Sequence, residues 1–120
     1  MPRLLLAAGA LVMALAVGLG AYASHATRAA AHPEAPRLLQ IAVLYMLVHG
    51  LALVGEGILA LRSASRWLYA AAALHAFGIL LFCGSLWWLA LAGAAPGMAP
   101  FGGTCFILGW VALALHARHA

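Results

Sequence analysis

The stretch YMLVHGLALVGE, residues 45–56, places a tyrosine, a histidine and a glutamate within an otherwise apolar run. It belongs to a longer hydrophobic span, Leu38 to Leu61, which His49 and Glu56 interrupt. A bilayer core about 30 Å thick is crossed by about 20 residues of helix. Because the span is long enough to cross it, the stretch predicts a transmembrane helix that carries ionisable groups in its middle.

The whole chain has the composition of a membrane protein. Of its 120 residues, 68% are hydrophobic and only 7% are charged, whereas about 25% of the residues of a soluble domain are charged. The net charge of +4 comes from six arginines and two glutamates. These arginines are scattered along the chain, and this argues against a nucleic-acid-binding surface, which gathers basic residues on one face. The expected partner is the lipid bilayer.

Hydropathy divides the chain into four such spans. We predict helices over residues 4–26, 37–61, 66–92 and 101–117. Backbone polar groups find no water in lipid, so spanning segments of this kind are helices. Short links between consecutive spans favour antiparallel neighbours. The predicted fold is therefore all-α, a single domain over 1–120 that forms an integral membrane bundle of four antiparallel transmembrane helices.

The first span also has some features of a secretory signal. Ala21-Tyr22-Ala23 has the A-x-A form of a cleavage site, but the apolar run from Leu4 to Ala23 has about 20 residues, whereas a signal core has about 7–15. We therefore expect a retained transmembrane helix.

The arginines predict how the helices are oriented. In a four-span topology, one face of the membrane carries both termini and the link between the second and third spans. Four arginines fall on that face and two on the other: Arg3, Arg62, Arg66 and Arg118 against Arg28 and Arg37. Since basic residues accumulate on the cytoplasmic side, we expect both termini to be cytoplasmic.

Four motifs, in the same order along the chain, resemble those of a known family. YMLVHGLAL, residues 45–53, is similar to the Y-x-x-x-H-A-L-A-L core of the family catalogued as domain of unknown function 423, which includes YgdD-like bacterial proteins and animal transmembrane protein 256-like proteins. GAYASHA at 20–26 resembles G-A-F-G-A-H-A, and GILLFCGSL at 78–86 resembles G-I-x-L-F-S-G-S-L. PFGG at 100–103, followed by Gly109-Trp110, resembles P-I-G-G…G-W.

This sequence departs from the family pattern at Gly50, where alanine is usual, and at Cys83, where serine is usual. Glu56 and His75 lie outside the motifs. The resemblance implies a small four-helix protein that crosses the bacterial inner membrane several times. It implies no particular activity.

Tyr45, His49 and Glu56 fall on one stripe of a helix, because they are separated by four and seven residues. A charged group at the centre of a span costs about 2.5–3.5 kcal/mol, so we expect the stripe to face the bundle interior, with His49 buried and uncharged. Two interpretations stay open. The stripe is either a path for protons, ions or a small molecule, or a source of interhelical hydrogen bonds worth about 0.6–2 kcal/mol each.

Ser24 and His25 end the first span on the face opposite the termini. We expect both at the outer mouth of the bundle, close to water. There His25 either titrates near neutral pH or bonds the last carbonyls of the helix, where a cation is favourable.

A cofactor is the alternative explanation of the buried histidines. His49 and His75 lie about 19 and 13 Å from the same boundary at 1.5 Å per residue, so they are candidate haem ligands, and an apolar bundle with a central histidine also suits a quinone. The main expectation is no cofactor and no metal. We interpret His116 and His119 as a solvated tail.

Cys83 and Cys105 are expected at a similar depth, so they either form a disulfide or remain two buried thiols, the interpretation we favour. The sequence contains no phosphate-binding loop and no H-E-x-x-H motif. These features predict a non-catalytic membrane protein that associates with itself or is an accessory subunit of a larger inner-membrane complex.

Overall fold

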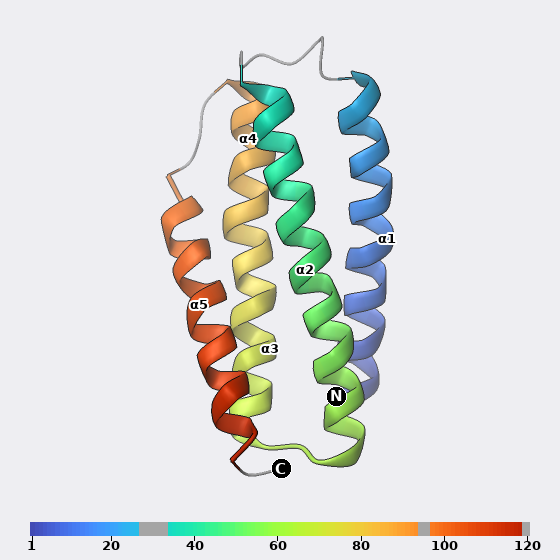
Figure 1. Ribbon diagram of the computed structural model, residues 1–120, viewed down its shortest axis with the longest axis vertical. Coiled ribbons are helices and arrows are strands. Elements are labelled where there is room, and N and C mark those ends of the chain that lie inside the picture. Colours follow the sequence, from blue (N-terminus) through green and yellow to red (C-terminus); the bar gives the residue numbers. More distant parts are fainter. Residues whose placement is uncertain (27–33, 94–96, 119–120) are drawn as a thin grey trace.

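The computed structural model is a set of long, nearly parallel helical rods (Figure 1). It describes residues 1–26, 34–93 and 97–118, and all the regular structure in this part of the chain is helical. The elements are α1 (Pro2–Ala26), α2 (Ala35–Arg62), α3 (Arg66–Gly78), the π-helical turn η2 (Ile79–Cys83), α4 (Gly84–Ala92) and α5 (Ala99–His116). Because α3, η2 and α4 are continuous, they form one rod, and the predicted all-α fold with four spans is confirmed.

The predicted helix bounds lie within two residues of the observed ones. The described residues include four helices that are long and apolar enough to cross a membrane, with mean hydropathy of 2.4, 2.0, 1.8 and 1.4 in chain order. The molecule extends 48 Å along its longest axis, so it spans a hydrocarbon core of about 30 Å with its ends in the headgroup regions.

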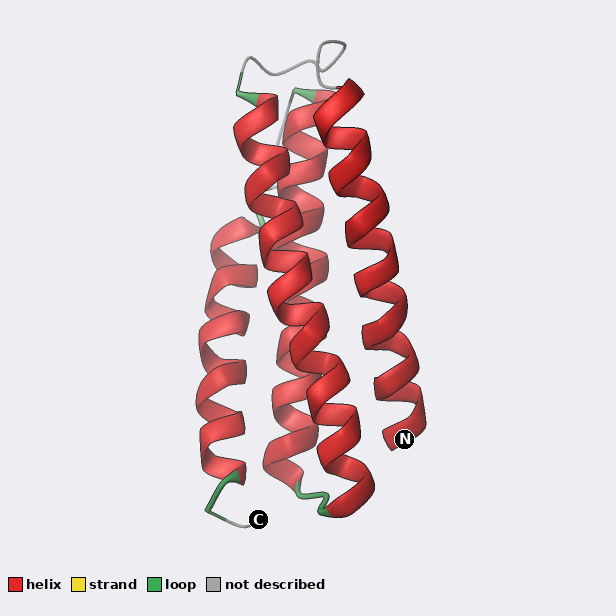
Figure 2. Cartoon of the chain, turned by 45° about the vertical axis from the view of Figure 1, so that its right-hand side comes forward, coloured by secondary structure: helices red, strands yellow, loops and turns green. Residues whose placement is uncertain are grey.

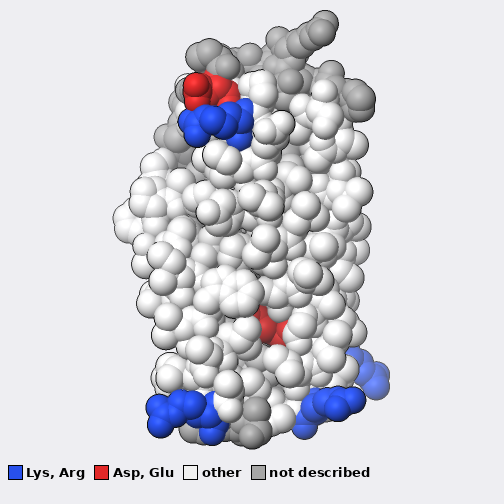
Figure 3. Space-filling view, in the orientation of Figure 1, with Lys and Arg blue, Asp and Glu red and all other residues white. Residues whose placement is uncertain are grey.

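Both termini lie at one end of the bundle (Figure 1). Arginine side chains gather at that end, whereas the opposite end shows one pair of opposite charges, and the surface between the two ends is almost free of charge (Figure 3). That pair is Arg37 and Glu34, with Nε and Oε2 2.6 Å apart. We call the end that carries the termini the terminal end. That it faces the cytoplasm stays a prediction of the positive-inside rule.

Local sequence signals set the helix ends. Proline stands in the first turn of α2 and of α5, where its missing N–H would have no helical partner. The Ser65 hydroxyl caps α3 by accepting from the Leu68 N–H at 3.2 Å. Gly93 ends α4 in the left-handed conformation at φ 77°, which glycine adopts without steric cost.

Helix α1 packs mainly against α2 and stands at one edge of the bundle (Figure 2). The two backbones touch at glycines. A Cβ atom added to Gly9 would lie 2.6 Å from the Val54 nitrogen, and one added to Gly57 would lie 2.6 Å from the Leu6 nitrogen. Close approach of this kind holds helices together in lipid, where apolar surface gains little by leaving the solvent.

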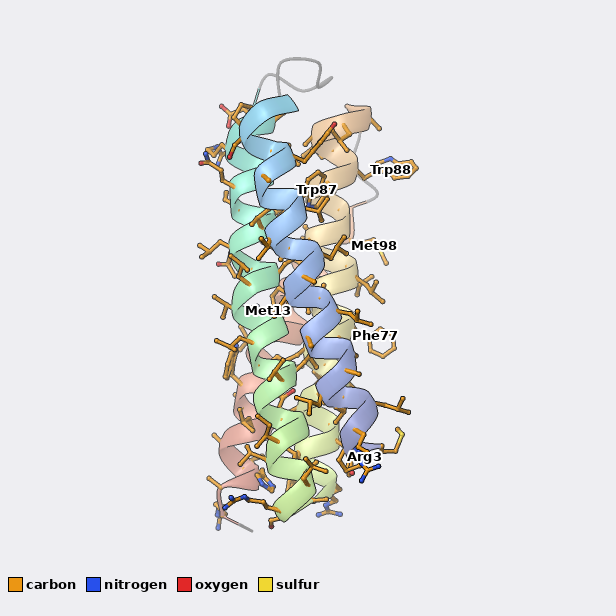
Figure 4. The ribbon with its side chains drawn as sticks, turned by 90° about the vertical axis from the view of Figure 1, so that its right-hand side faces the viewer. Arg3, Met13, Phe77, Trp87, Trp88 and Met98 are labelled. Atoms are coloured by element: carbon orange, nitrogen blue, oxygen red, sulfur yellow. The ribbon has the colours of Figure 1, made fainter. Side chains whose placement is uncertain are left out.

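The buried core runs along the inner faces of α2 and of the α3–α4 rod, with contributions from α1 and α5. Its central cluster contains Ala16, Ala42, Met46, Leu53, Ala72, Ile79, Cys83 and Phe106. Phe77, Trp88 and Met98 project away from the helices, whereas Trp87 lies between α1 and α4 (Figure 4). Cys83 and Cys105 are both free thiols; Cys83 is buried, as the favoured interpretation expected, but Cys105 is only partly buried.

Candidate functional site: a buried polar cluster between three helices

Two ionisable side chains meet in the interior of the bundle. Glu56 of α2 is 1% exposed and His75 of α3 is 0% exposed. Their Oε1 and Nδ1 atoms are 2.6 Å apart, which is hydrogen-bonding distance. The cost of a polar group in the membrane interior explains why each of these side chains lies against the other rather than against lipid.

Small residues next to Glu56 and His75 leave room for the two side chains to meet between the helices. Glu56 lies on the face of α2 that buries Leu53 and Gly57. On α5, a Cβ atom added to Gly109 would lie 2.6 Å from His75 Nε2. Glycine at that position therefore makes room for the imidazole between α3 and α5.

Each member of the pair has a second polar atom that the pairing leaves free. Glu56 Oε2 and His75 Nε2 are buried and have no hydrogen-bond partner among the described residues. Such atoms are uncommon in folded proteins, because a buried donor or acceptor without a partner costs about 1–3 kcal/mol.

His49, on α2, is held by two different bonds. Its Nδ1 lies 2.8 Å from the backbone oxygen of Tyr45, and the Trp110 indole N–H donates to its Nε2 at 3.0 Å. A carbonyl only accepts and an indole N–H only donates. His49 is therefore the neutral tautomer that carries its proton on Nδ1, and neither ring nitrogen is free.

Aromatic rings surround His49. Phe106 stacks on it with ring centroids 3.6 Å apart, and the His75 ring lies 5.4 Å away, centroid to centroid. A pocket of about 430 Å³ opens beside these rings. It is lined by Tyr45, Val48, His49, Phe82, Gly103, Phe106, Ile107 and Trp110.

A third buried histidine lies near the terminal end. His116, in the last turn of α5, is only 3% exposed, and its Nδ1 lies 2.7 Å from the Ser65 hydroxyl. The prediction of a solvated tail is wrong for His116, because the end of α5 packs against the start of α3. His119 lies outside the described residues.

The predicted interior stripe is correct for two of its three members. His49 and Glu56 are buried, at 3% and 1% exposure, but Tyr45 is 38% exposed, and the prediction is wrong for Tyr45. The three side chains also form no continuous hydrogen-bonded path, because Glu56 bonds to His75 whereas His49 bonds to Trp110.

The structure places Ser24 on the exposed surface at the end of α1, where its hydroxyl donates to the Gly20 carbonyl at 3.1 Å. The side chain of His25 lies outside the described residues, so its expected place at the outer mouth stays a prediction.

The haem alternative stays a prediction, although the surroundings of His49 do not favour it. Both ring nitrogens of His49 are engaged, and the Phe106 ring covers one face of the imidazole. Among the described residues, no group of three or more histidine, cysteine, aspartate or glutamate side chains could hold a metal ion.

Sequence reasoning missed three partnerships: His75 with Glu56, Trp110 with His49, and Ser65 with His116. The first could have been found from helix geometry. Glu56 lies six residues from Arg62 and His75 lies nine residues from Arg66, which places them about 9 and 13 Å from the same end.

Comparison with known proteins identifies relatives along most of the chain. Residues 19–103 match the family model described as "Protein of unknown function (DUF423)". A UPF0382 membrane protein of Staphylococcus epidermidis is 33% identical over 109 residues, which cover 89% of this chain and 88% of the relative. A UPF0382 membrane protein of Haemophilus influenzae is 34% identical over 107 residues, with 82% and 80% covered.

The UPF0382 inner membrane protein YgdD of Escherichia coli is 31% identical over 103 residues, which cover 84% of this chain and 79% of the relative. No solved structure matches the chain.

Proposed function

The chain belongs to the protein family of unknown function DUF423. We propose that it is a non-catalytic protein of the bacterial inner membrane. In this proposal it acts by associating with itself, as a small accessory component of a larger membrane complex. One observation carries this proposal. Ala10, Ala14 and Gly18 of α1 are four residues apart and all exposed, and thus form a small-residue stripe on the outside of the bundle.

The small size of these residues serves no close helix contact within a single copy. A Cβ atom added to Gly18 would meet no other atom within 4 Å, whereas one added to Gly9 on the inner side would touch the α2 backbone. Small residues at four-residue spacing allow two transmembrane helices to approach closely. The occupant that fits the stripe is α1 of a second copy, because the same small residues would then face each other.

The enclosure of the polar cluster supports a non-catalytic role. Glu56 and His75 are almost fully buried, and neither side chain lines the pockets at Gly20, Tyr69, His49 or Cys83. The helices also account for nearly all the described residues, and few of these residues lie outside the membrane-spanning helices to form a separate catalytic site.

Native mass spectrometry after mild detergent extraction tests self-association. We expect the wild-type chain to be a dimer or larger, and Ala14→Ile and Gly18→Ile to shift it towards the monomer. The matched control is Ala114→Ile, at an exposed position of α5, which should leave the oligomer intact. A wild-type chain that is monomeric and carries no other subunit would contradict the proposal.

A second candidate function is supported by the pocket beside His49. Tyr45 lines this pocket, and its hydroxyl has no hydrogen-bond partner among the described residues. An unpaired hydroxyl in an apolar medium is unfavourable by several kcal/mol. A quinone offers carbonyl acceptors and a flat ring suited to the aromatic walls, and it reaches the pocket through the lipid.

Organic extraction of the purified protein, followed by mass spectrometry, tests the quinone candidate. We expect quinone at a fixed ratio to protein, reduced severalfold by Tyr45→Phe. Tyr69→Phe is the control, since Tyr69 lines a different pocket. Equal quinone in all three proteins, or phospholipid alone, would argue against this site.

A further inference from the structure

The geometry points to a proton-binding site in the membrane interior: we propose that Glu56 and His75 together bind and release one proton, and that this proton exchanges with the terminal end of the bundle. The inference is independent of the proposed self-association, because it rests on side chains in the interior of one copy.

Charge counting shows why the pair holds a proton. When Glu56 is a carboxylate and His75 is a neutral imidazole that donates from Nδ1, the pair carries one negative charge. One further proton makes the pair neutral overall, either as carboxylate with imidazolium or as carboxylic acid with imidazole. Since an apolar interior disfavours net charge, the neutral, protonated pair is the form that suits this position.

No other charge in the described part of the chain compensates the pair. No arginine lies within salt-bridge distance of Glu56, whose salt-bridge partner is His75. The His49 ring lies 5.4 Å from the His75 ring, centroid to centroid, and His49 is fixed as a neutral tautomer by its two bonds. From α5, Gly109 and Trp110 face His75, and neither carries a charge.

The polar groups around the pair block transfer through His49. A proton relay needs groups that both accept and donate a proton. The Tyr45 carbonyl cannot donate and the Trp110 indole cannot accept, so His49, bonded to both, is not a relay. The site therefore opens to one end of the bundle and is not part of a path through the whole membrane.

The terminal end is the side on which the site opens. Glu56 is six residues, about 9 Å, from the end of α2 at Arg62, but 21 residues, about 31 Å, from its start at Ala35. Polar groups also lie on the side of the bundle nearer to Glu56. His116 and Ser65 are hydrogen-bonded to each other there, and His116 Nε2 has no partner among the described residues.

Labelling with dicyclohexylcarbodiimide tests the site, because this apolar reagent reacts with protonated carboxyl groups within membranes. The chain contains only two acidic side chains, Glu34 and Glu56, and the C-terminal carboxyl group is distinguished by peptide mapping. In lipid vesicles we expect label on Glu56, lost in Glu56→Gln and retained in Glu34→Gln. At pH values above the midpoint, where fewer than half of the pairs hold the proton, the labelling rate should fall about tenfold per pH unit.

The side of access is tested in vesicles of uniform orientation, with the pH changed on one side only. The rate should follow the pH at the terminal end and ignore the pH at the other. Labelling that ignores pH on both sides would show a purely structural pair and overturn the proposal, and labelling that follows the opposite side would overturn its sidedness. If Glu56→Gln fails to fold, infrared spectroscopy of the wild-type protein provides the test. We expect the band of a protonated carboxyl group, with the same pH dependence as the labelling. Absence of this band at every pH would refute the site.

Discussion

The indole N–H of Trp110 donates to Nε2 of His49 at 3.0 Å, and this bond joins α5 to α2 in the middle of the bundle. The bond fixes the tautomer of His49, because the other ring nitrogen faces a backbone carbonyl. Both helices also contribute aromatic rings at this level, with Phe106 stacked on the imidazole. A single indole therefore determines what His49 can do chemically.

Replacing Trp110 with phenylalanine should destabilise the bundle. The change keeps an aromatic ring but leaves the buried Nε2 of His49 without a donor, and we expect a loss of about 1–3 kcal/mol in the free energy of unfolding. Reversible unfolding in mixed detergent micelles measures it. Trp88→Phe is the control, since Trp88 is 61% exposed and should change stability by less than half as much. Equal effects of the two substitutions would mean that the bond contributes nothing.

The Glu56–His75 pair should show strong coupling in a double-mutant cycle. Glu56→Leu alone leaves a buried imidazole unpaired, and His75→Leu alone leaves a buried carboxyl group, so each should cost about 3–5 kcal/mol. The double substitution removes both polar groups and should cost much less than the sum of the two. Unfolding free energies of the four proteins give the coupling, and additive costs would show that the pair does not act as a unit.

Hydropathy predicts the helices of this chain well because the lipid itself imposes their length. The bilayer thickness and the need for internal backbone hydrogen bonds fix where a span begins and ends, so the predicted bounds are close to the observed ones. Hydropathy does not determine the rotation of each helix about its axis. From the sequence, the partner of Glu56 could therefore have been found only by comparing the depth of Glu56 in the membrane with that of His75, which helix geometry permits.

Two of the errors have physical causes that a pattern of residues does not reveal. Tyr45 lies on the same stripe as Glu56, but its ring is at the opening of the pocket beside Phe106 and stays partly exposed. His116 was interpreted as part of a solvated tail because it is close to the end of the chain. The start of α3 buries it, and Ser65 supplies the polar partner that makes this burial tolerable.

Ser65 should contribute to stability twice. Its hydroxyl accepts from the Leu68 N–H as the cap of α3 and bonds to His116. Loss of a serine cap costs about 1 kcal/mol, and a buried histidine left without its partner adds about 1–3 kcal/mol. Ser65→Ala should therefore lower the free energy of unfolding by about 2–4 kcal/mol in total. Ser63→Ala, at an exposed position of the same link, is the control and should be almost neutral.

Gly109 should tolerate a methyl group far less well than Gly55, although both lie within helices. An alanine Cβ at position 109 would lie 2.6 Å from His75 Nε2, whereas one at position 55 would meet nothing within 4 Å. The first substitution must displace the imidazole, and overpacking of this kind costs about 1–3 kcal/mol. The second should stabilise the helix by up to about 1 kcal/mol, because alanine has the higher helix propensity.

The displaced imidazole also predicts an effect beyond stability. Nitrogen NMR of selectively labelled histidines should show changed His75 signals in Gly109→Ala and unchanged ones in Gly55→Ala. If the His75 signals are the same in both variants, the imidazole does not lie against Gly109 and the arrangement of α3 and α5 described above is incorrect.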